Sequence, residues 1–252
     1  MTLPVAILAG GVATRLGNLA RHTPKSLIDV AGKPFIAYQL DLLRGHGLTD
    51  IVLCTGHLGS HLEEVVGDGS RYGVRVRYSP DGPSPLGTGG ALRHALPLLG
   101  EAFLALYGDS YLECDYQAVE RAFRASGDPA LLTVIRNDNQ WDRSNVLCIN
   151  GRIVHYSKEH RTSDMRHIDY GLAAMRADVF RLHPDGSALD LARVYEDLAA
   201  RHELAAYEVS ERFYEIGTLA GLAETRRHLE QKRVGQKSKG KGQIMSWAGF
   251  AF

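Results

Sequence analysis

Cysteine is scarce in this chain, and no two cysteines are close in the sequence. The three that occur, Cys54, Cys114 and Cys148, are far apart, and none belongs to a C-x-x-C pair. This spacing gives no support to a disulfide framework or a cysteine-based zinc site. We expect reduced, buried thiols of the kind found in cytoplasmic proteins.

Long apolar runs are also missing. No stretch approaches the ~20 apolar residues that span a bilayer. The N-terminus lacks a basic region followed by an apolar core. We therefore expect neither a signal peptide nor a membrane partner, and we predict a cytoplasmic location.

The chain has no formal net charge at pH 7, since its 29 basic residues balance 29 acidic ones. Five of the bases and none of the acids lie in residues 232–252, so residues 1–231 have 24 bases against 29 acids, a net charge of −5. A globule of this sign is a poor general binder of nucleic acid. Any phosphate site must therefore be assembled locally.

Several common catalytic motifs do not occur. There is no G-x-G-x-x-G fingerprint, no G-x-x-x-x-G-K-[ST] phosphate loop and no G-x-S-x-G elbow. His57 and His61 are four residues apart on a predicted helix, a spacing that can bind zinc, but no third ligand is evident nearby.

The first half of the chain alternates between buried strands and helices. This alternation predicts an α/β fold, with a parallel sheet and helices on both faces. Ligands bind such sheets beyond the carboxyl ends of the strands. The predicted strands are residues 5–8, 50–54, 74–78 and 102–107, and the predicted helices are 34–44, 57–66 and 89–99.

The second half consists mostly of short strands, and Asn150-Gly151 predicts a hairpin turn. No Pro/Ser-rich linker separates the halves. We predict one domain over residues 1–231, with a nucleotide-binding half (about 1–115) and an acceptor-binding half (116–231), followed by a basic, flexible tail (232–252). The predicted elements are helices 116–125, 177–182, 189–201 and 219–231, and strands 130–135, 145–149, 152–157, 168–175 and 204–209.

A glycine-rich turn follows the first strand. Gly10 and Gly11 have no Cβ, so they can take positive φ and let a ligand lie against bare backbone. The turn supplies N–H donors, Arg15 a planar fork of donors and Lys25 a point charge, which together suit a polyphosphate. Turns of this kind also occur for purely structural reasons.

Other polar residues have two interpretations each. Asp109 follows a buried strand and suits Mg²⁺, but it would equally cap a helix. Glu215 is a second candidate ligand or an exposed strand residue. Gly87 opens a glycine-rich helix entry that would admit a flat base, or it is a plain junction. Lys158 and Asp169, taken alone, are more typical of solvated charges.

Five motifs occur in a fixed order along about residues 3–231. They are LAGGVATRL (8–16), PKSLIDVAGKPF (24–35), LGTGGAL (86–92), YGDS (107–110) and FYEIGT (213–218). Together they resemble the motifs of the sugar-1-phosphate nucleotidylyltransferases. The resemblance implies a Rossmann-like three-layer α/β/α fold with a mixed, mostly parallel central sheet. It also implies the reaction NTP + sugar 1-phosphate → NDP-sugar + pyrophosphate, which supplies activated sugar for cell-surface polysaccharide or glycoconjugate synthesis.

The resemblance also implies a role for each matching residue. Arg15 and Lys25 would be the catalytic residues that hold the triphosphate, and Asp109 and Glu215 would hold the Mg²⁺ cofactor. Nucleotide contacts would come from Leu8, Ala9, Gly10, Gly11, Thr14, Gly87 and Thr88. Sugar-phosphate contacts would come from Asn145, Lys158 and Gly171. Glu215 stands where the family more often has Asp, and Ser157-Lys158-Glu159 replaces the family's frequent Glu-Lys-Pro.

The chain most resembles the short bacterial members that activate heptose, mannose or amino-sugar 1-phosphates, such as the heptose 1-phosphate guanylyltransferases. It has no hexapeptide repeats of a fused acyltransferase. One alternative is a cytidylyltransferase for a non-sugar phosphate, and another is a non-catalytic sugar-nucleotide-binding regulator. The expected partners are a nucleoside triphosphate and a sugar 1-phosphate. The oligomeric state, including a homo-oligomer, stays open.

Overall fold

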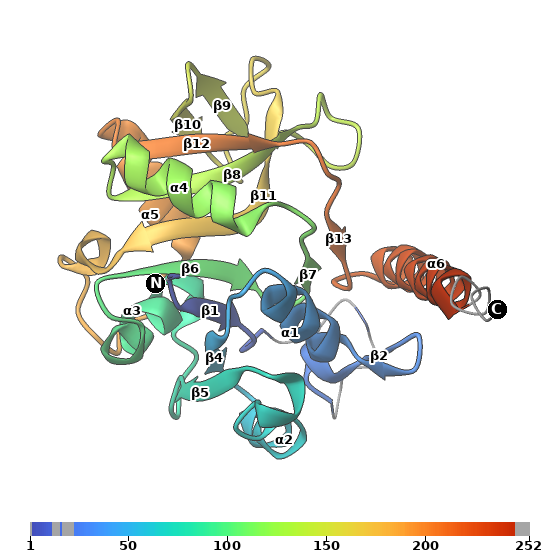
Figure 1. Ribbon diagram of the computed structural model, residues 1–252. Coiled ribbons are helices and arrows are strands. Elements are labelled where there is room, and N and C mark those ends of the chain that lie inside the picture. The colour runs from blue at the N-terminus through green and yellow to red at the C-terminus, as the bar shows by residue number, and fades with distance from the viewer. Residues whose placement is uncertain (1, 12–15, 17–22, 245–252) are drawn as a thin grey trace.

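A sheet of nine strands forms the centre of the described protein (Figure 1). The computed structural model describes residues 2–11, 16 and 23–244, with side chains described to residue 234. The strand order is β5-β4-β1-β6-β11-β8-β12-β10-β9. The strands are β1 (Val5–Leu8), β4 (Asp50–Thr55), β5 (Arg75–Pro80), β6 (Ala102–Tyr107), β8 (Ala130–Arg136), β9 (Val146–Ile149), β10 (Arg152–Tyr156), β11 (His167–Arg176) and β12 (Leu204–Val209).

Two small strand pairs and six α-helices complete the described fold. The pairs are β2 (Asp29–Val30) with β3 (Lys33–Pro34), and β7 (Ser110–Tyr111) with β13 (Tyr214–Glu215). The helices are α1 (Phe35–Gly45), α2 (Gly59–Val66), α3 (Gly87–Leu99), α4 (Tyr116–Ser126), α5 (Leu191–Ala200) and α6 (Leu219–Ile244), with 3₁₀ turns at Lys25–Leu27, Ser70–Tyr72 and Ala177–Phe180.

The four strands of the first half are parallel, as the alternating pattern predicts. β1 lies between β4 and β6, so Val5 is level with both Ile51 and Leu104. The chain passes from β5, at one edge, to β6 on the far side of β1. Such a reversal of strand order opens a crevice beyond the carboxyl ends of β1 and β6, where ligands of open α/β sheets bind.

The second half pairs differently. β11 runs antiparallel between β6 and β8, and β9 and β10 form the predicted hairpin, with Asn150 and Gly151 both at positive φ. The described sheet is therefore mixed, but parallel pairing predominates only in the first half, with four parallel and five antiparallel pairings overall. Short hairpin connections, unlike helical crossovers, join strands in antiparallel order.

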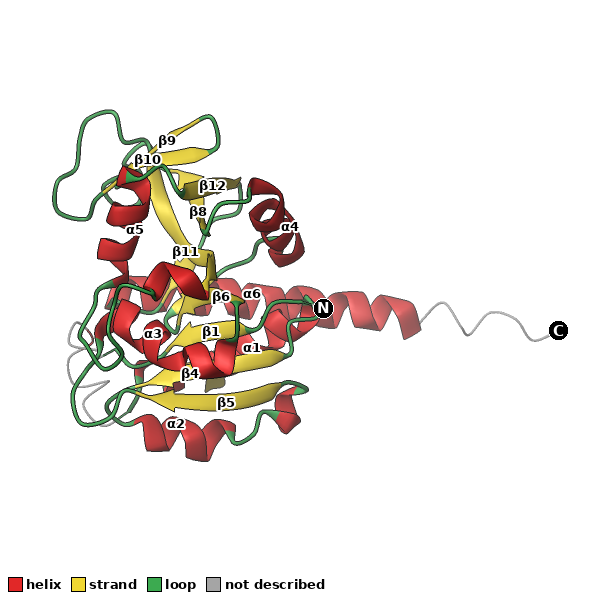
Figure 2. Cartoon of the chain, turned by 90° about the vertical axis from the view of Figure 1, so that its left-hand side faces the viewer, coloured by secondary structure: helices red, strands yellow, loops and turns green. Residues whose placement is uncertain are grey.

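Helices pack on both faces of the sheet. One face is covered by apolar side chains of α1, α2 and α4, such as Leu40, Leu62 and Val119. The other is covered by α3 and α5, through residues such as Leu92 and Leu198. Figure 2 shows α4 and α5 on opposite sides of the sheet. None of the described helices has the length and apolar character that a membrane crossing requires.

The last helix is longer than predicted. α6 continues past Gln231 to Ile244, so the predicted helix end was wrong. The glycines at 235, 240 and 242 each cost a helix only about 1 kcal/mol, and the intervening residues include Lys and Gln, which favour helices. Lys232 and Arg233, expected in a tail, contact the body: Lys232 pairs with Glu113, and Arg233 Nη1 donates to the Ala31 carbonyl at 3.2 Å.

Two other predicted helices also differ from the structure, one in its first residue and one in its type. Leu58 has a φ of 64°, in the left-handed region, so α2 begins only at Gly59 and His57 is not on a helix with His61. No group of three or more His, Cys, Asp and Glu residues that could hold a metal ion occurs in the described part of the chain. The helix predicted at 177–182 is a single 3₁₀ turn.

The described cysteines are all free. Cys54 and Cys114 are buried, as predicted, whereas Cys148 is only half-buried. Burial raises the pKa of the Cys54 and Cys114 thiols to about 12, so both stay protonated and unreactive near pH 7.

Close backbone packing, not positive φ, requires glycine in the turn after β1. A Cβ on Gly10 would lie 3.0 Å from the Gly56 nitrogen, and a Cβ on Gly56 would lie 2.8 Å from the Gly10 carbonyl oxygen. Neither residue has a φ in the left-handed region, so the freedom of glycine to take positive φ is not used at either position. The turns after β1 and β4 therefore touch without side chains between them.

We expect Gly56→Ala to destabilise the fold by about 1–3 kcal/mol, because the added methyl group meets rigid backbone. Gly45→Ala is the matched control. Gly45 ends α1 with open space around its Cα, so alanine there should leave stability unchanged or raise it by up to about 1 kcal/mol. Urea unfolding of both variants measures the difference. Equal stability of Gly56→Ala and the parent chain would contradict this account.

Candidate active site

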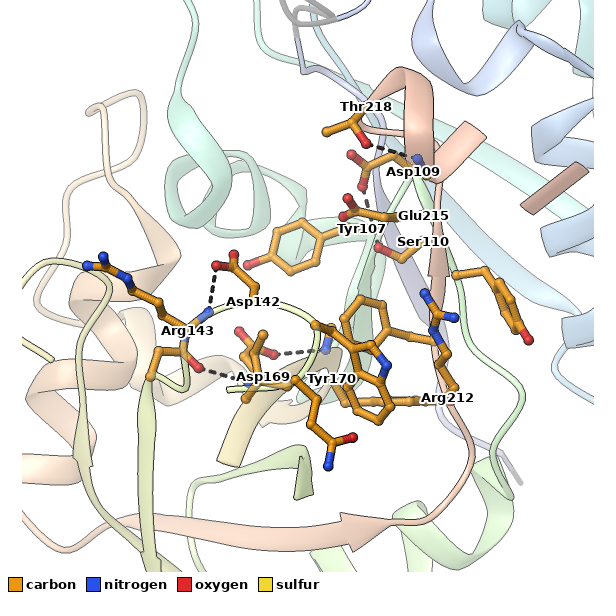
Figure 3. Close-up of a pocket in the computed structure, with 18 of the residues that line it drawn as sticks. Tyr107, Asp109, Ser110, Asp142, Arg143, Asp169, Tyr170, Arg212, Glu215 and Thr218 are labelled. Carbon is orange, nitrogen blue, oxygen red and sulfur yellow. Dashed lines mark hydrogen bonds between the residues drawn. The ribbon is translucent and has the colours of Figure 1, made fainter. Parts of the chain in front are cut away.

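Two adjoining cavities lie at the carboxyl ends of β1 and β6. The smaller, about 260 Å³, is enclosed by the turn after β1, the segment around Lys25 and the entry to α3. The larger, about 670 Å³, lies towards β11 and β13 (Figure 3). We call them the small and the large cavity. Tyr107 and Asp109 line both, so they form part of a shared wall.

Every described residue that the sequence assigned to a site lines one of these cavities. Thr14 and Arg15 lie outside the described residues. The small cavity is lined by Leu8, Ala9, Gly10, Gly11, Lys25, Gly87, Thr88 and Asp109. The large cavity is lined by Asp109, Asn145, Lys158, Gly171 and Glu215. The fold thus brings together residues up to 207 positions apart in the sequence.

Asp109 is held in place through the backbone of its own turn. The buried Gln39 side chain of α1 donates from Nε2 to the Tyr107 carbonyl at 2.9 Å and to the Ser110 carbonyl at 2.8 Å. The Gly108 N–H donates to the Leu8 carbonyl at 2.9 Å. A strand, β7, follows Asp109. The helix-cap alternative for Asp109 was therefore wrong.

The carboxylates of Asp109 and Glu215 both lie close to Gly217. β13 pairs with β7 so that Glu215 is level with Ser110, and the Ile216 N–H donates to the Asp109 carbonyl at 2.9 Å. A Cβ built on Gly217 would lie 3.3 Å from Asp109 Oδ2 and 3.8 Å from Glu215 Oε1. Glu215 is half-buried, not an exposed strand residue. Two hard oxygen ligands at one point fit Mg²⁺, which takes one or two carboxylates together with substrate phosphates.

Lys25 contacts the same wall through Asp109. It begins the 3₁₀ turn Lys25–Leu27 after the extended Pro24, and its Nζ lies 2.9 Å from Asp109 Oδ2. The two side chains are 20% and 26% exposed, so the ion pair is partly shielded from water. Lys25 is thereby held at the boundary between the two cavities.

The backbone at the entry to α3 is hydrogen-bonded to a distant segment of the chain. The N–H groups of Gly89 and Gly90 both donate to the Leu189 carbonyl, at 2.9 and 3.1 Å. A Cβ on Gly87 would lie 2.7 Å from that same carbonyl oxygen. Thr88 Oγ1 accepts the Leu191 N–H at 2.9 Å. The glycines here serve close packing against residues 187–191, and Gly87 and Thr88 line the small cavity with the rest of their surface.

Asp169 lies at the centre of the predicted acceptor residues. Its carboxylate accepts the Gly171 N–H at 2.8 Å and the Tyr156 hydroxyl at 3.1 Å, and its own N–H donates to Asn145 Oδ1 at 3.0 Å. Burial raises the pKa of Asp169, while the charge of Lys158 opposes that rise. The interpretation of Asp169 as a solvated charge was wrong. Lys158 itself is exposed on the wall of the large cavity.

Gly171 allows the turn in β11 that gives Asp169 this position. Its φ is +98°, a backbone conformation that L side chains rarely adopt. The pairing of β11 with β8 is irregular between Asp169 and Ala173. Such irregularities redirect side chains at the ends of strands. Here the irregularity directs Asp169 into the large cavity.

Sequence reasoning missed several residues of the large cavity. The most informative signal was a charged residue, Asp169, in the otherwise apolar run Ile168–Leu172. Arg212 gave no local signal, although its guanidinium lies 5.8 Å from the Trp141 ring and pairs with Glu224 at 2.6 Å. Three arginines line this cavity: Arg143, Arg161 and Arg212.

The chain belongs to the nucleotidyl transferase family, whose sequence profile matches residues 5–144. Residues of this chain are 45% identical over 113 positions to N-acetylmuramate alpha-1-phosphate uridylyltransferase of Neisseria meningitidis serogroup B, covering 44% of this chain and 49% of that protein. The chain is also 23% identical over 175 positions to D-glycero-alpha-D-manno-heptose 1-phosphate guanylyltransferase of Campylobacter jejuni. This alignment covers 69% of this chain and 76% of that protein.

A similar fold occurs in UDP-glucose pyrophosphorylase of Acinetobacter baumanii, with a TM-score of 0.74 at 18% identity, covering 97% of this chain and 100% of that one. The likeness concerns the fold. The aligned parts span about half or less of the length of several curated relatives.

Proposed function

We propose that the chain is a sugar-1-phosphate nucleotidylyltransferase, which converts an NTP and a sugar 1-phosphate to an NDP-sugar and pyrophosphate. One observation carries the proposal: the small and the large cavity meet at Asp109, with Lys25 Nζ 2.9 Å from its carboxylate. A nucleotide in the small cavity and a sugar phosphate in the large one would present their phosphates to this shared wall. The names of both relatives above, with different bases and sugars, agree with this reaction.

The acceptor supplies its own nucleophile. A phosphate monoester is already largely ionised near pH 7, so an oxygen of the sugar phosphate can attack the α-phosphorus without a general base. The bond to pyrophosphate then breaks in line with the attack. The protein's task is to position both substrates and to neutralise charge. Lys25 would exchange Asp109 for phosphate oxygens as the nucleotide binds.

Asp109 and Glu215 would hold Mg²⁺, which supplies charge neutralisation on the phosphate oxygens when bound. Asn145, Lys158 and Gly171 would face the acceptor, and Leu8 to Gly11, Gly87 and Thr88 the nucleoside. From the sequence alone, we propose that Arg15 holds the triphosphate and that Thr14 contacts the nucleotide. We also propose the three-layer Rossmann-like form of the fold, a cytoplasmic location and a role in glycan precursor supply.

A pyrophosphate-release screen tests the function. ATP, CTP, GTP, UTP and dTTP are each combined with glucose, mannose, heptose and N-acetylmuramate 1-phosphates in the presence of Mg²⁺. We expect release for at least one pair, with an equal amount of NDP-sugar, and no release when either substrate is omitted or EDTA is added. NTP binding without release for every pair would instead support the non-catalytic regulator.

A further inference from the structure

Tyr107 has a buried hydroxyl group without a hydrogen-bond partner. It ends β6, two residues before Asp109, and lines both cavities. Its hydroxyl oxygen is almost completely shielded from solvent and finds no partner within the described part of the protein. A buried polar group without a partner costs free energy. An atom of this kind in a cavity wall indicates a ligand that completes its hydrogen bonding.

Tyr107 and Asp169 both pack around Gly171. The position of a Cβ on Gly171 is 3.5 Å from Tyr107 Cδ2, and the Gly171 N–H is 2.8 Å from Asp169 Oδ1. In Figure 3 the ring of Tyr107 lies between the carboxylates of Asp109 and Asp169. A phenol hydroxyl carries its hydrogen at physiological pH and can donate it to a ligand.

This pair of groups suits a hydroxyl ligand better than a phosphate. A sugar hydroxyl can donate its hydrogen to a carboxylate and accept one from a phenol. An ionised phosphate has no hydrogen to donate to Asp169 and would be repelled by its charge. Charged donors for phosphate, such as Lys25, Lys158 and Arg161, lie elsewhere on the cavity walls.

We propose that Tyr107 is a specificity-determining residue of the acceptor site, whose hydroxyl, together with the Asp169 carboxylate, binds one ring hydroxyl of the sugar 1-phosphate. The inference rests on the proposed function for the identity of the acceptor. A site that binds a substrate hydroxyl from both sides rejects the deoxy analogue strongly, because the Tyr107 hydroxyl then stays buried without a partner and the Asp169 carboxylate lacks the hydrogen bond from the sugar.

The test compares acceptor binding by the parent chain and by Tyr107→Phe. Calorimetry is performed with Mg²⁺ and a non-reactive α,β-methylene NTP, and the probe is the tightest binder among glucose, mannose and N-acetylmuramate 1-phosphates. We expect Tyr107→Phe to bind this acceptor roughly tenfold more weakly. Affinity for the NTP analogue should not change. The parent chain should also bind one monodeoxy analogue of this acceptor roughly 10²-fold more weakly than the acceptor itself. In Tyr107→Phe, the difference in affinity between the acceptor and the same analogue should be much smaller.

Thermal unfolding separates recognition from a structural role. Removing an unpartnered buried hydroxyl should leave the Tm of Tyr107→Phe unchanged or raised. The matched control is Tyr116→Phe, because the Tyr116 hydroxyl is also buried but donates to the Leu112 carbonyl at 2.9 Å. That variant should have a lower Tm and unchanged acceptor affinity.

Two results would overturn the inference: unchanged acceptor affinity of Tyr107→Phe, or an equal loss in Tyr116→Phe. The proposed function fails separately, through absence of pyrophosphate release by the parent chain. A parent chain that binds no sugar 1-phosphate would overturn both.

Discussion

Asp109→Asn lowers kcat/KM for pyrophosphate release by at least about 10³-fold, the loss expected when a carboxylate that anchors charge neutralisation at the reacting phosphates becomes neutral. The substitution keeps the shape of the side chain. Asp109 loses its ion pair with Lys25, but a partly exposed pair contributes only about 1 kcal/mol or less to stability. The variant should therefore fold normally and need much higher Mg²⁺ for its residual activity.

Asp50→Asn is the matched control for this substitution. Asp50 is also paired with basic side chains, Arg75 and Arg77, each at 2.9 Å, but it lies at the start of β4, away from both cavities. Its replacement should change kcat/KM by less than about twofold, since it removes only surface ion pairs. Steady-state assays across a Mg²⁺ titration measure both variants. Activity of Asp109→Asn within tenfold of the parent would contradict the assignment.

The second large effect is expected for Lys25→Met. Methionine keeps most of the length of the lysine stem but removes the charge that would stabilise the triphosphate. We expect kcat to fall by about 10²–10³-fold, the usual loss for one preorganised donor to developing charge. Binding of the NTP in the ground state should weaken less than kcat falls, because the contact is strongest in the transition state.

Lys33→Met controls for the loss of a paired lysine. Lys33 pairs with Asp41, and its Nζ lies 4.0 Å from the centre of the Tyr38 ring, outside both cavities. Its replacement should leave both kcat and KM near the parent values. Kinetics with varied NTP and a fixed acceptor concentration separate the two parameters. A Lys25→Met enzyme that loses only affinity, with kcat intact, would assign Lys25 to ground-state binding alone.

The first half of the fold follows directly from local sequence. β1, β4 and β6 are short apolar runs, and each is predicted to within one residue of its observed bounds. The glycine and aspartate residues that follow these strands also indicate which strand ends face a ligand. The spacing of these elements is local, so periodicity and turn residues suffice.

The second half depends on pairings between distant residues. β11 enters the sheet between β6 and β8, and this pairing, together with the local turn at Gly171, brings Asp169 and Gly171 towards Tyr107. For the same reason the partnerless hydroxyl of Tyr107 was not foreseeable. The contact of Leu189 with the entry to α3 likewise joins residues about 100 positions apart. The resemblance to the family indicated Asn145 and Lys158, but it assigned no role to the Asp169 carboxylate.

The proposed function requires the chain to transfer a nucleotidyl group to a sugar phosphate at the wall shared by the two cavities. The most direct measurement follows two labels, [α-³²P]NTP and [γ-³²P]NTP, in parallel reactions with the sugar 1-phosphate and Mg²⁺. We expect the α label to enter the NDP-sugar and the γ label to enter pyrophosphate only when the acceptor is present, and at least about 10³-fold more slowly with Asp109→Asn. Appearance of the γ label on the sugar, or of the α label in a free nucleotide without acceptor, would contradict it.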